Sequence, residues 1–330
     1  MSRYAVCLTS DENYLFPALV AASQARVAAP GDDIDIFVMA MGLTDEATEK
    51  YSRIADKYHV KFIHVGRTLF GGQSSNEFVD ALFKKSKFTF GVLGRLFLDD
   101  VLPPEYDQIL YIDGDIKIEG SLSELVRAPT PDGCFLAAPD PKIFWINDDT
   151  PEAAAERAYM EGIGIGPDRY HDYFNAGVIR INRSGWGQIG HAAWDYIQAN
   201  PEKCVCYDQS ALNAVSAGRR LPMSIKWNYP SYWDFYKLGP GIHPRITHFM
   251  SRPKPWNGAF PPWGDADHQI YVRFAKDNPV LASGLNRFET RERMRYHLQQ
   301  RYKWLYAKAH PQIGRTLAEQ AALWEANVVV

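Results

Sequence analysis

Short apolar runs alternate along most of the chain with longer segments whose apolar positions recur at helical spacing. Runs rich in β-branched and aromatic residues predict strands, and the segments between them predict helices. This alternation is typical of an α/β fold with a mostly parallel sheet and helices on both faces. The predicted strands are Tyr4–Leu8, Ile34–Met39, Lys61–Val65, Gln108–Ile112, Phe135–Ala138, Gly177–Ile181 and Arg245–Phe249. The predicted helices are Tyr14–Ala28, Asp45–Tyr58 and Phe90–Leu102, and Pro103 and Pro104 end the last of them.

Composition and charge restrict the function. The chain has 330 residues, 46% of them hydrophobic, which is enough to bury one large core with a small appendage. Its 36 basic residues are balanced by 39 acidic ones, so the sequence lacks the basic excess of a nucleic-acid-binding protein. The apolar run at the N-terminus breaks at Ser10 before it reaches the length of a signal peptide, and no later stretch approaches a membrane span. We therefore expect a cytoplasmic enzyme that does not act on DNA or RNA.

The composition changes after about residue 285, where cations and aromatic residues become mixed. We expect a catalytic domain over residues 1–284 and a helical extension over residues 285–330. One interpretation of the extension, which begins near Arg287, is an interfacial helix that holds the protein peripherally on the inner face of the cytoplasmic membrane. Its apolar stripe would consist of Met294, Leu298, Tyr302 and Leu305, and its lipid-facing cations would be Arg293, Arg301 and Lys303. The alternative is a helix docked on the core with a solvated basic face.

Ligands of such sheets bind outside the carboxyl ends of the strands, and one strand exit carries two acids. Asp113 and Asp115 follow the apolar run that ends at Ile112, with only Gly114 between them. In an extended chain residues i and i+2 face the same side, and glycine allows the backbone to turn so that both carboxylates converge. Carboxylate oxygens suit Mg²⁺ or Mn²⁺, which would bind a pyrophosphate. The alternative is a solvated loop with two capping aspartates.

Other strand exits allow two interpretations each. Asp11 and Asn13 can cap the helix that follows, or they can bind a base or ribose while Tyr14 packs on the ring. His248 ends the last predicted strand, and a lone histidine there is either a structural residue or a ligand.

Two further segments also allow two interpretations each. The small pair Ala176 and Gly177 starts a strand, where it allows either a close ligand or a tight turn. Asp208 and Gln209 lie at a predicted helix start, where the acid can be a cap or part of a site.

Taken together, these segments resemble glycosyltransferase family 8, which includes bacterial lipopolysaccharide galactosyl- and glucosyltransferases and glycogenin. The resemblance covers roughly the first 260 residues in the right order. It rests on the segments 10–14, 109–115, 174–178, 207–209 and 248–256. It implies a GT-A type fold, a nucleotide-sugar donor such as a UDP-sugar, usually Mn²⁺, a glycan acceptor, and retention at the anomeric carbon.

The resemblance also implies roles for individual residues. Asp113, Asp115 and His248 would be the metal ligands. Contacts to the nucleotide sugar would come from Thr9, Asp11, Asn13, Tyr14, Arg95, Asp113, Gly114, Ala176, Gly177 and Lys254. Asn175, Asp208 and Gln209 would surround the transferred sugar. One departure is Ser251, because the family commonly has glycine three residues after the histidine.

The chemistry of these residue types agrees with such a reaction. A divalent cation with Lys254 beside it would stabilise the departing diphosphate. Retention by double displacement needs a carboxylate nucleophile, but the residue placed at the anomeric carbon is Gln209, with Asp208 beside it. We therefore expect same-face attack. A metal-dependent sugar-nucleotide hydrolase, which needs no acceptor, and a non-catalytic glycan-binding protein remain alternatives. The identity of the hexose, galactose or glucose, and of the acceptor, lipopolysaccharide or another glycan, is not determined by these residues.

Overall fold

Seven strands form the main sheet of the computed structural model, which describes residues 3–84, 90–285 and 288–330. These strands are β1 (Arg3–Ser10), β2 (Ile34–Met41), β3 (Lys61–Val65), β4 (Tyr106–Ile112), β6 (Phe135–Pro139), β7 (Phe174–Asn182) and β8 (Arg220–Pro222). Their order is β3-β2-β1-β4-β7-β6-β8. β7 runs antiparallel to β4 and β6, and the other neighbouring pairs are parallel. The prediction of a mostly parallel sheet is therefore confirmed.

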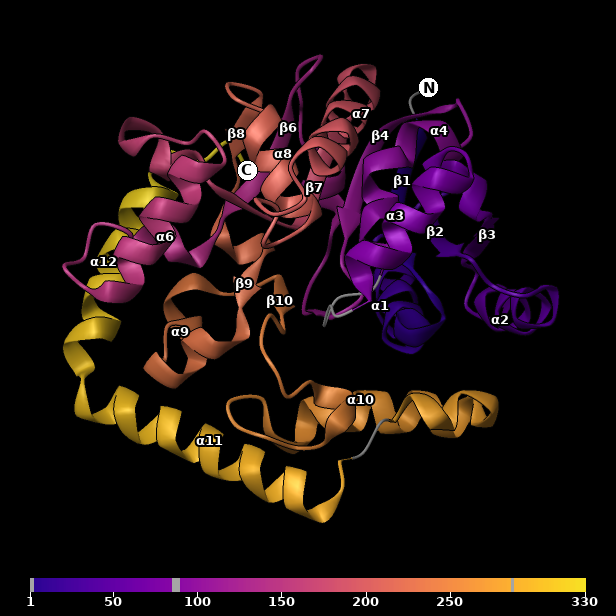
Figure 1. Cartoon of the computed structure of the whole chain (residues 1–330). Helices are drawn as coiled ribbons and strands as arrows, with labels where there is room; N and C mark the ends of the chain where they lie inside the picture. Colours follow the sequence, from indigo (N-terminus) through magenta and orange to yellow (C-terminus); the bar gives the residue numbers. More distant parts are fainter. Residues whose placement is uncertain (1–2, 85–89, 286–287) are drawn as a thin grey trace.

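Helices cover both faces of this sheet (Figure 1). The α-helices are α1 (Leu15–Ala28), α2 (Asp45–Lys57), α3 (Gln73–Phe83), α4 (Leu98–Val101), α5 (Ser123–Val126), α6 (Pro151–Gly162), α7 (Arg183–Ala199), α8 (Asp208–Val215), α9 (Gly239–Ile242), α10 (Gly264–Asp277), α11 (Thr290–Ala309) and α12 (Pro311–Glu325). Side chains of β1 alternate between the two layers: Val6 and Leu8 pack with α1, α2 and α10, whereas Ala5 and Cys7 pack with α3, α7 and α8. The core thus consists of two apolar layers on either side of the sheet.

The predicted helix Phe90–Leu102 is wrong over most of its length. A 3-10 helix, η3, spans Phe90–Phe97, and only Leu98–Val101 is α-helical. Two glycines explain the difference, because glycine is a poor helix former and both lie against β1. A Cβ at Gly91 would lie 2.6 Å from the backbone nitrogen of Asp11, and one at Gly94 would lie 2.9 Å from Cβ of Thr9. The segment is therefore shaped by close packing on the sheet.

The last predicted strand does not belong to the main sheet. β10 (Ile246–His248) lies in a second sheet of order β5-β10-β9, with β5 (Ile116–Ile118) and β9 (Tyr229–Pro230). It pairs antiparallel with β5, and His248 is the partner of Ile116. Because β5 begins directly after Asp115, this small sheet brings His248 to the exit of β4.

The C-terminal helices lie at the edge of the molecule, where α11 is followed by α12 (Figure 1). α12 packs on the domain predicted over residues 1–284: Leu317 and Ala321 are buried against Trp233, and the backbone oxygen of Val330 accepts a hydrogen bond from the nitrogen of Ser224 at 2.8 Å. α11 buries Tyr296, Gln300 and Ala307. The part of the extension that begins at Thr290 is therefore attached to the domain, whereas Arg287 lies outside the described residues.

The apolar stripe of the extension is exposed. Its members, Met294, Leu298, Tyr302 and Leu305, are 48–67% exposed. α11 thus packs on the rest of the chain mainly through Tyr296, Gln300 and Ala307 and leaves most of the stripe exposed. None of the helices in the described ranges has both the length and the apolar character needed to cross a bilayer.

Candidate active site

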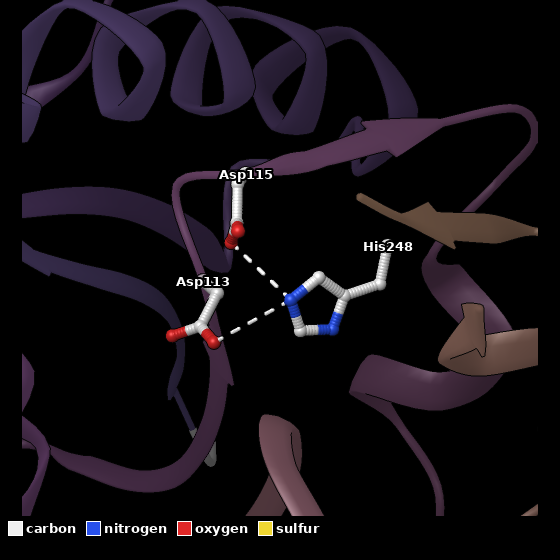
Figure 2. Close-up of side chains that lie close together, drawn as sticks. All are labelled: Asp113, Asp115 and His248. Atoms are coloured by element: carbon white, nitrogen blue, oxygen red, sulfur yellow. Dashed lines mark ion pairs between the residues drawn. The ribbon is translucent and has the colours of Figure 1, made fainter. Parts of the chain in front are cut away.

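The two aspartates and the histidine meet where β4 ends. The backbone nitrogen of Asp113 donates to the oxygen of Gly177 at 2.8 Å, so β7 holds the exit of β4 in place. Beyond the turn, the nitrogen of Phe249 donates to the oxygen of Asp115 at 2.9 Å. Two different sheets thus place Asp113, Asp115 and His248 together, and one ligand atom of each lies within 4.8 Å of the others. In Figure 2 the imidazole points between the two carboxylates.

The distances in this cluster suit a divalent cation. Nε2 of His248 lies 3.2 Å from Oδ1 of Asp115 and 3.8 Å from Oδ2 of Asp113. Two carboxylate oxygens and one imidazole nitrogen form a donor set that Mn²⁺ and Mg²⁺ accept. The residues therefore fit the metal that the sequence predicts.

A chain of amides determines which nitrogen of His248 faces the carboxylates. The backbone nitrogen of Gly177 donates to Oδ1 of Asn175 at 3.0 Å, and Nδ2 of Asn228 donates to the same oxygen at 2.9 Å. Oδ1 of Asn228 consequently faces Nδ1 of His248 at 2.9 Å and accepts a hydrogen bond from it. Nε2 is thus the nitrogen that faces the carboxylates, and it would bind a metal once it has lost its proton.

The sequence contained no signal for Asn228, because it is a single amide outside every motif. It is fully buried, and only the fold brings it to His248.

Two glycines are required by close packing around the cluster. A Cβ at Gly177 would lie 2.3 Å from Cε1 of His248, so only glycine leaves room for the imidazole. A Cβ at Gly114 would lie 3.1 Å from Cα of Ala18 in α1. The expected turn is present at residues 114–115, but Gly114 does not have a positive φ, so glycine is needed there for the approach of α1.

Positive groups neutralise Asp115. Nζ of Lys254 donates to Oδ2 of Asp115 at 2.6 Å and also to the backbone oxygen of Phe249. Burial alone would raise the pKa of Asp115, but Lys254 and His248 outweigh it and hold this pKa well below its usual range. The hydroxyl of Tyr14 lies 3.4 Å from the same carboxylate, so the exit of β1 reaches the cluster as well. Asp115 is therefore ionised and ready to act as a ligand.

Arg95 joins the cluster to the start of α8. Its Nη2 donates to Oδ1 of Asp113 at 2.8 Å, its Nε lies 2.9 Å from Oδ2 of Asp208, and its Nη1 donates to the oxygen of Ala176. Burial raises the pKa of Asp208 to about 6, although Arg95 opposes this shift. Asp208 does not cap α8, because Tyr207 occupies the cap position with φ of 46°. The acid is turned toward Arg95 and the site.

Gln209 lies in a network that contains a carboxylate the sequence analysis missed. Oε1 of Gln209 accepts from Nδ2 of Asn175 and from the nitrogen of Ala176, both at 3.1 Å. Its Nε2 donates to Oδ2 of Asp140 at 2.9 Å and to the hydroxyl of Tyr173 at 3.2 Å. Asp140 follows β6, so its position at a strand exit was the one signal that could have identified it. Both lone pairs of the Gln209 carbonyl are occupied by donors.

The three residues predicted to bind the nucleotide after β1 differ in burial and in their contacts. Asp11 is buried and caps the short 3-10 helix Glu12–Tyr14 by accepting from the nitrogen of Asn13 at 3.1 Å. Asn13 is exposed, and the ring of Tyr14 meets Trp256 edge-on, with centroids 5.4 Å apart. Asp11 therefore caps the 3-10 turn that precedes α1, and the Asn13 side chain lies at the surface.

A hydroxyl chain connects the same strand exit to the cluster. Thr9 lies 3.3 Å from the hydroxyl of Tyr111, which donates to Oδ1 of Asp113 at 2.7 Å. Ser251, in the loop after His248, has no positive φ, so serine fits there without strain.

Comparisons with known proteins agree with this arrangement. The sequence profile of Glycosyl transferase family 8 matches residues 5–259. Lipopolysaccharide 1,3-galactosyltransferase of Salmonella typhimurium is 21% identical over 84% of this chain and 78% of its own length. Lipopolysaccharide glucosyltransferase WaaO of Escherichia coli is 20% identical over 90% of this chain and 85% of its own length. These matches extend over most of both chains.

Solved structures show the same fold. The galactosyltransferase LgtC, solved in complex with donor and acceptor sugar analogs, aligns with a TM-score of 0.61 and 20% identity over 83% of this chain and 95% of its own. The main sheet and its two helical layers are thus of the GT-A type, as the resemblance implied. Because the family profile spans more than half of the sequence, the chain belongs to glycosyl transferase family 8.

Proposed function

We propose that this enzyme transfers a hexose, galactose or glucose, from a UDP-sugar to a glycan acceptor with retention of configuration and with the help of Mn²⁺ or Mg²⁺. The observation that carries the proposal is the convergence of Asp113, Asp115 and His248 beside Lys254. The names of the lipopolysaccharide galactosyl- and glucosyltransferase relatives support a hexose and an acceptor related to lipopolysaccharide.

The residues around the cluster would bind the donor in three parts. Asp11, Asn13 and Tyr14 would hold the uridine, and Thr9 would support this edge through Tyr111. Arg95, Gly114, Ala176, Gly177 and Lys254 would contact the diphosphate and the sugar. Asn175, Asp208 and Gln209 would contact the transferred hexose. A bound divalent cation would supply positive charge at the departing diphosphate.

The side chains favour same-face attack over a covalent intermediate. The Gln209 carbonyl accepts two hydrogen bonds, and Asp208 is paired with Arg95, so neither group is free to act as a nucleophile. Lys254 and Arg95 are fixed cations that stabilise negative charge on the leaving diphosphate. The diphosphate would then accept the proton of the acceptor hydroxyl. Asp140, 2.9 Å from Gln209, is the carboxylate that a double displacement would have to recruit.

One assay tests the donor specificity and separates the alternatives. The protein is incubated with Mn²⁺ and a panel of nucleotide sugars, and slow donor hydrolysis is measured for each. Without an acceptor, we expect slow hydrolysis of UDP-galactose or UDP-glucose. When a glycan acceptor is added, we expect transfer of the sugar to the acceptor in place of hydrolysis. Hydrolysis that no acceptor diverts would favour a sugar-nucleotide hydrolase, and no turnover of any donor would favour a glycan-binding protein.

We also propose that residues 1–284 form the catalytic domain and that α11 holds the enzyme peripherally on the inner face of the cytoplasmic membrane. The exposed stripe that includes Met294 and Leu298 supports this location, because exposed apolar side chains beside cations suit an interface. Replacing both with serine should leave the fold intact and reduce co-sedimentation with anionic liposomes. Unchanged sedimentation would contradict it. Deletion of residues 286–330 is unsuitable, because it would also uncover Trp233.

A further inference from the structure

A cavity of about 500 Å³ lies between α11 and η7, the 3-10 helix Ser231–Tyr236. This volume is within the range of small-ligand sites, which are typically lined by aromatic side chains and a few polar groups. Five aromatic residues and one cation line it: Tyr232, Phe235, Tyr236, Tyr302, Tyr306 and Lys303. The rings of Tyr302 and Tyr306 are separated by 6.2 Å and tilted by 35°. Flat aromatic walls of this kind fit the C–H face of a pyranose ring, whose hydroxyls lie at its edge.

The ammonium group of Lys303 places a positive charge at this cavity. Its side chain is partly buried, and among the residues the structure describes it has no hydrogen-bond or ion-pair partner. Burial lowers the pKa of Lys303, which reflects the cost of removing an ammonium from water without an anion beside it. A phosphate or carboxylate in the cavity would supply the missing partner.

The cavity adjoins the candidate active site at two places. Ser251 lines it, and this residue lies in the loop between His248 and Lys254. The buried amide of Gln300 in α11 lies 3.4 Å from the backbone oxygen of Arg252 in the same loop. A ligand in the cavity would thus lie next to the loop that carries His248 and Lys254.

We propose that this cavity binds an anionic sugar unit of the acceptor glycan, with its pyranose face against Tyr302 and Tyr306 and its phosphate or carboxylate at Lys303. The inference rests on the proposed function, since it names the acceptor of that transfer. It explains why α11, which buries few residues of its own, contacts the loop between His248 and Lys254. It also gives the C-terminal extension, which lies outside the residues matched by the family profile, a part in acceptor specificity.

Binding of small sugars tests the assignment without turnover. The full chain is kept in saturating UDP and Mn²⁺ to fill the donor site, and glucose 6-phosphate, glucuronic acid, glucose and inorganic phosphate are titrated by ligand-observed NMR. We expect the two anionic sugars to bind more tightly than glucose or phosphate alone. Lys303→Gln should weaken their binding by about tenfold or more, because a charged hydrogen bond is lost. Tyr306→Ala should weaken the binding of all three sugars.

Matched variants on the same helix serve as controls. Nζ of Lys308 lies 4.4 Å from the ring centre of Trp304, and neither residue lines the cavity. Lys308→Gln and Trp304→Ala should therefore leave sugar binding unchanged. Equal binding by Lys303→Gln and the wild type would overturn the assignment. So would a loss of anionic-liposome binding in Lys303→Gln without a change in sugar binding, which would make this a lipid contact.

Donor hydrolysis separates this inference from the proposed function. A wild type that hydrolyses a UDP-sugar with Mn²⁺ but binds neither anionic sugar would overturn the cavity assignment alone. A wild type that binds the anionic sugars but hydrolyses no donor would support the cavity and contradict the transferase. Lys303→Gln should hydrolyse the donor at the wild-type rate while its KM for an anionic acceptor rises.

Discussion

The side-chain oxygen of Asn228 lies 2.9 Å from Nδ1 of His248, and this contact leaves Nε2 of the imidazole facing two carboxylates. Asn228→Ala removes the acceptor that holds the tautomer, so the affinity for Mn²⁺ should fall by about 10–100-fold, as for other partners of metal-binding histidines. Asn228→Asp keeps an acceptor at this position and should restore part of the affinity. Titration of Mn²⁺ in the presence of UDP measures both.

Asn278→Ala is the control for the loss of a buried amide. Asn278 binds the hydroxyl of Tyr58 at 2.7 Å, away from the cluster. This variant should lose stability and keep its Mn²⁺ affinity. An Asn228→Ala protein that binds Mn²⁺ as tightly as Asn278→Ala would contradict the assigned tautomer.

Gly177 makes room for the imidazole. A Cβ at this position would lie 2.3 Å from Cε1 of His248, so Gly177→Ala must displace the ring. We expect turnover to fall by about tenfold or more, since a misplacement of about 1 Å costs as much as 100-fold. Gly162→Ala, where nothing lies within 4 Å of the added Cβ, should have wild-type activity. Steady-state kinetics of the two variants at saturating Mn²⁺ would refute this role if both were fully active.

Asp208 should make activity and stability depend on pH. Its pKa of about 6 lies above the ordinary value of 3.8, so the folded protein holds this proton more tightly than the unfolded chain. Asp208 therefore destabilises the fold progressively as the pH rises from about 4 to about 6. The difference in unfolding free energy between Asp208→Asn and the wild type should grow over that interval, as urea titrations would detect.

Activity should change in the same interval. If the ionised carboxylate positions Arg95, kcat of the wild type falls below about pH 6. Asp208→Asn should have a lower kcat and lack this acid limb. A variant that kept the limb unchanged would show that another group causes it.

Gln209 should affect the rate without forming a covalent intermediate. Gln209→Ala removes the hydrogen bonds to Asn175 and Asp140, so we expect a slower reaction and no trapped sugar. Intact-mass spectrometry of the wild type during turnover should find an unmodified chain. A hexose attached to Asp208 or Asp140 would instead establish double displacement.

Much of the main sheet follows from the sequence. The strands β1, β2, β3, β4, β6 and β7 all lie where short runs rich in β-branched and aromatic residues predicted them. The pair Asp113 and Asp115 was recognisable for the same reason, since it directly follows such a run. Ordered motifs then connected it to distant residues such as His248.

The small second sheet and part of the candidate site depend on contacts that no local sequence pattern encodes. β5 and β9 have three and two residues, which is too short for a periodic signal. Asn228 and Asp140 are isolated polar residues, and only long-range packing makes them neighbours of His248 and Gln209. The four residues of the predicted stripe on α11 are exposed, but which side of this helix contacts the rest of the chain depends on η7.

The most direct test of the metal-assisted transfer is the turnover of Asp113→Asn and Asp115→Asn across a Mn²⁺ titration. Both variants keep the shape of the cluster and remove one anionic ligand, so we expect turnover to fall below detection while the melting temperature stays within a few degrees. Asp107→Asn, an exposed carboxylate on β4 itself, should titrate like the wild type. Full activity of both cluster variants in the presence of a chelator would contradict the account.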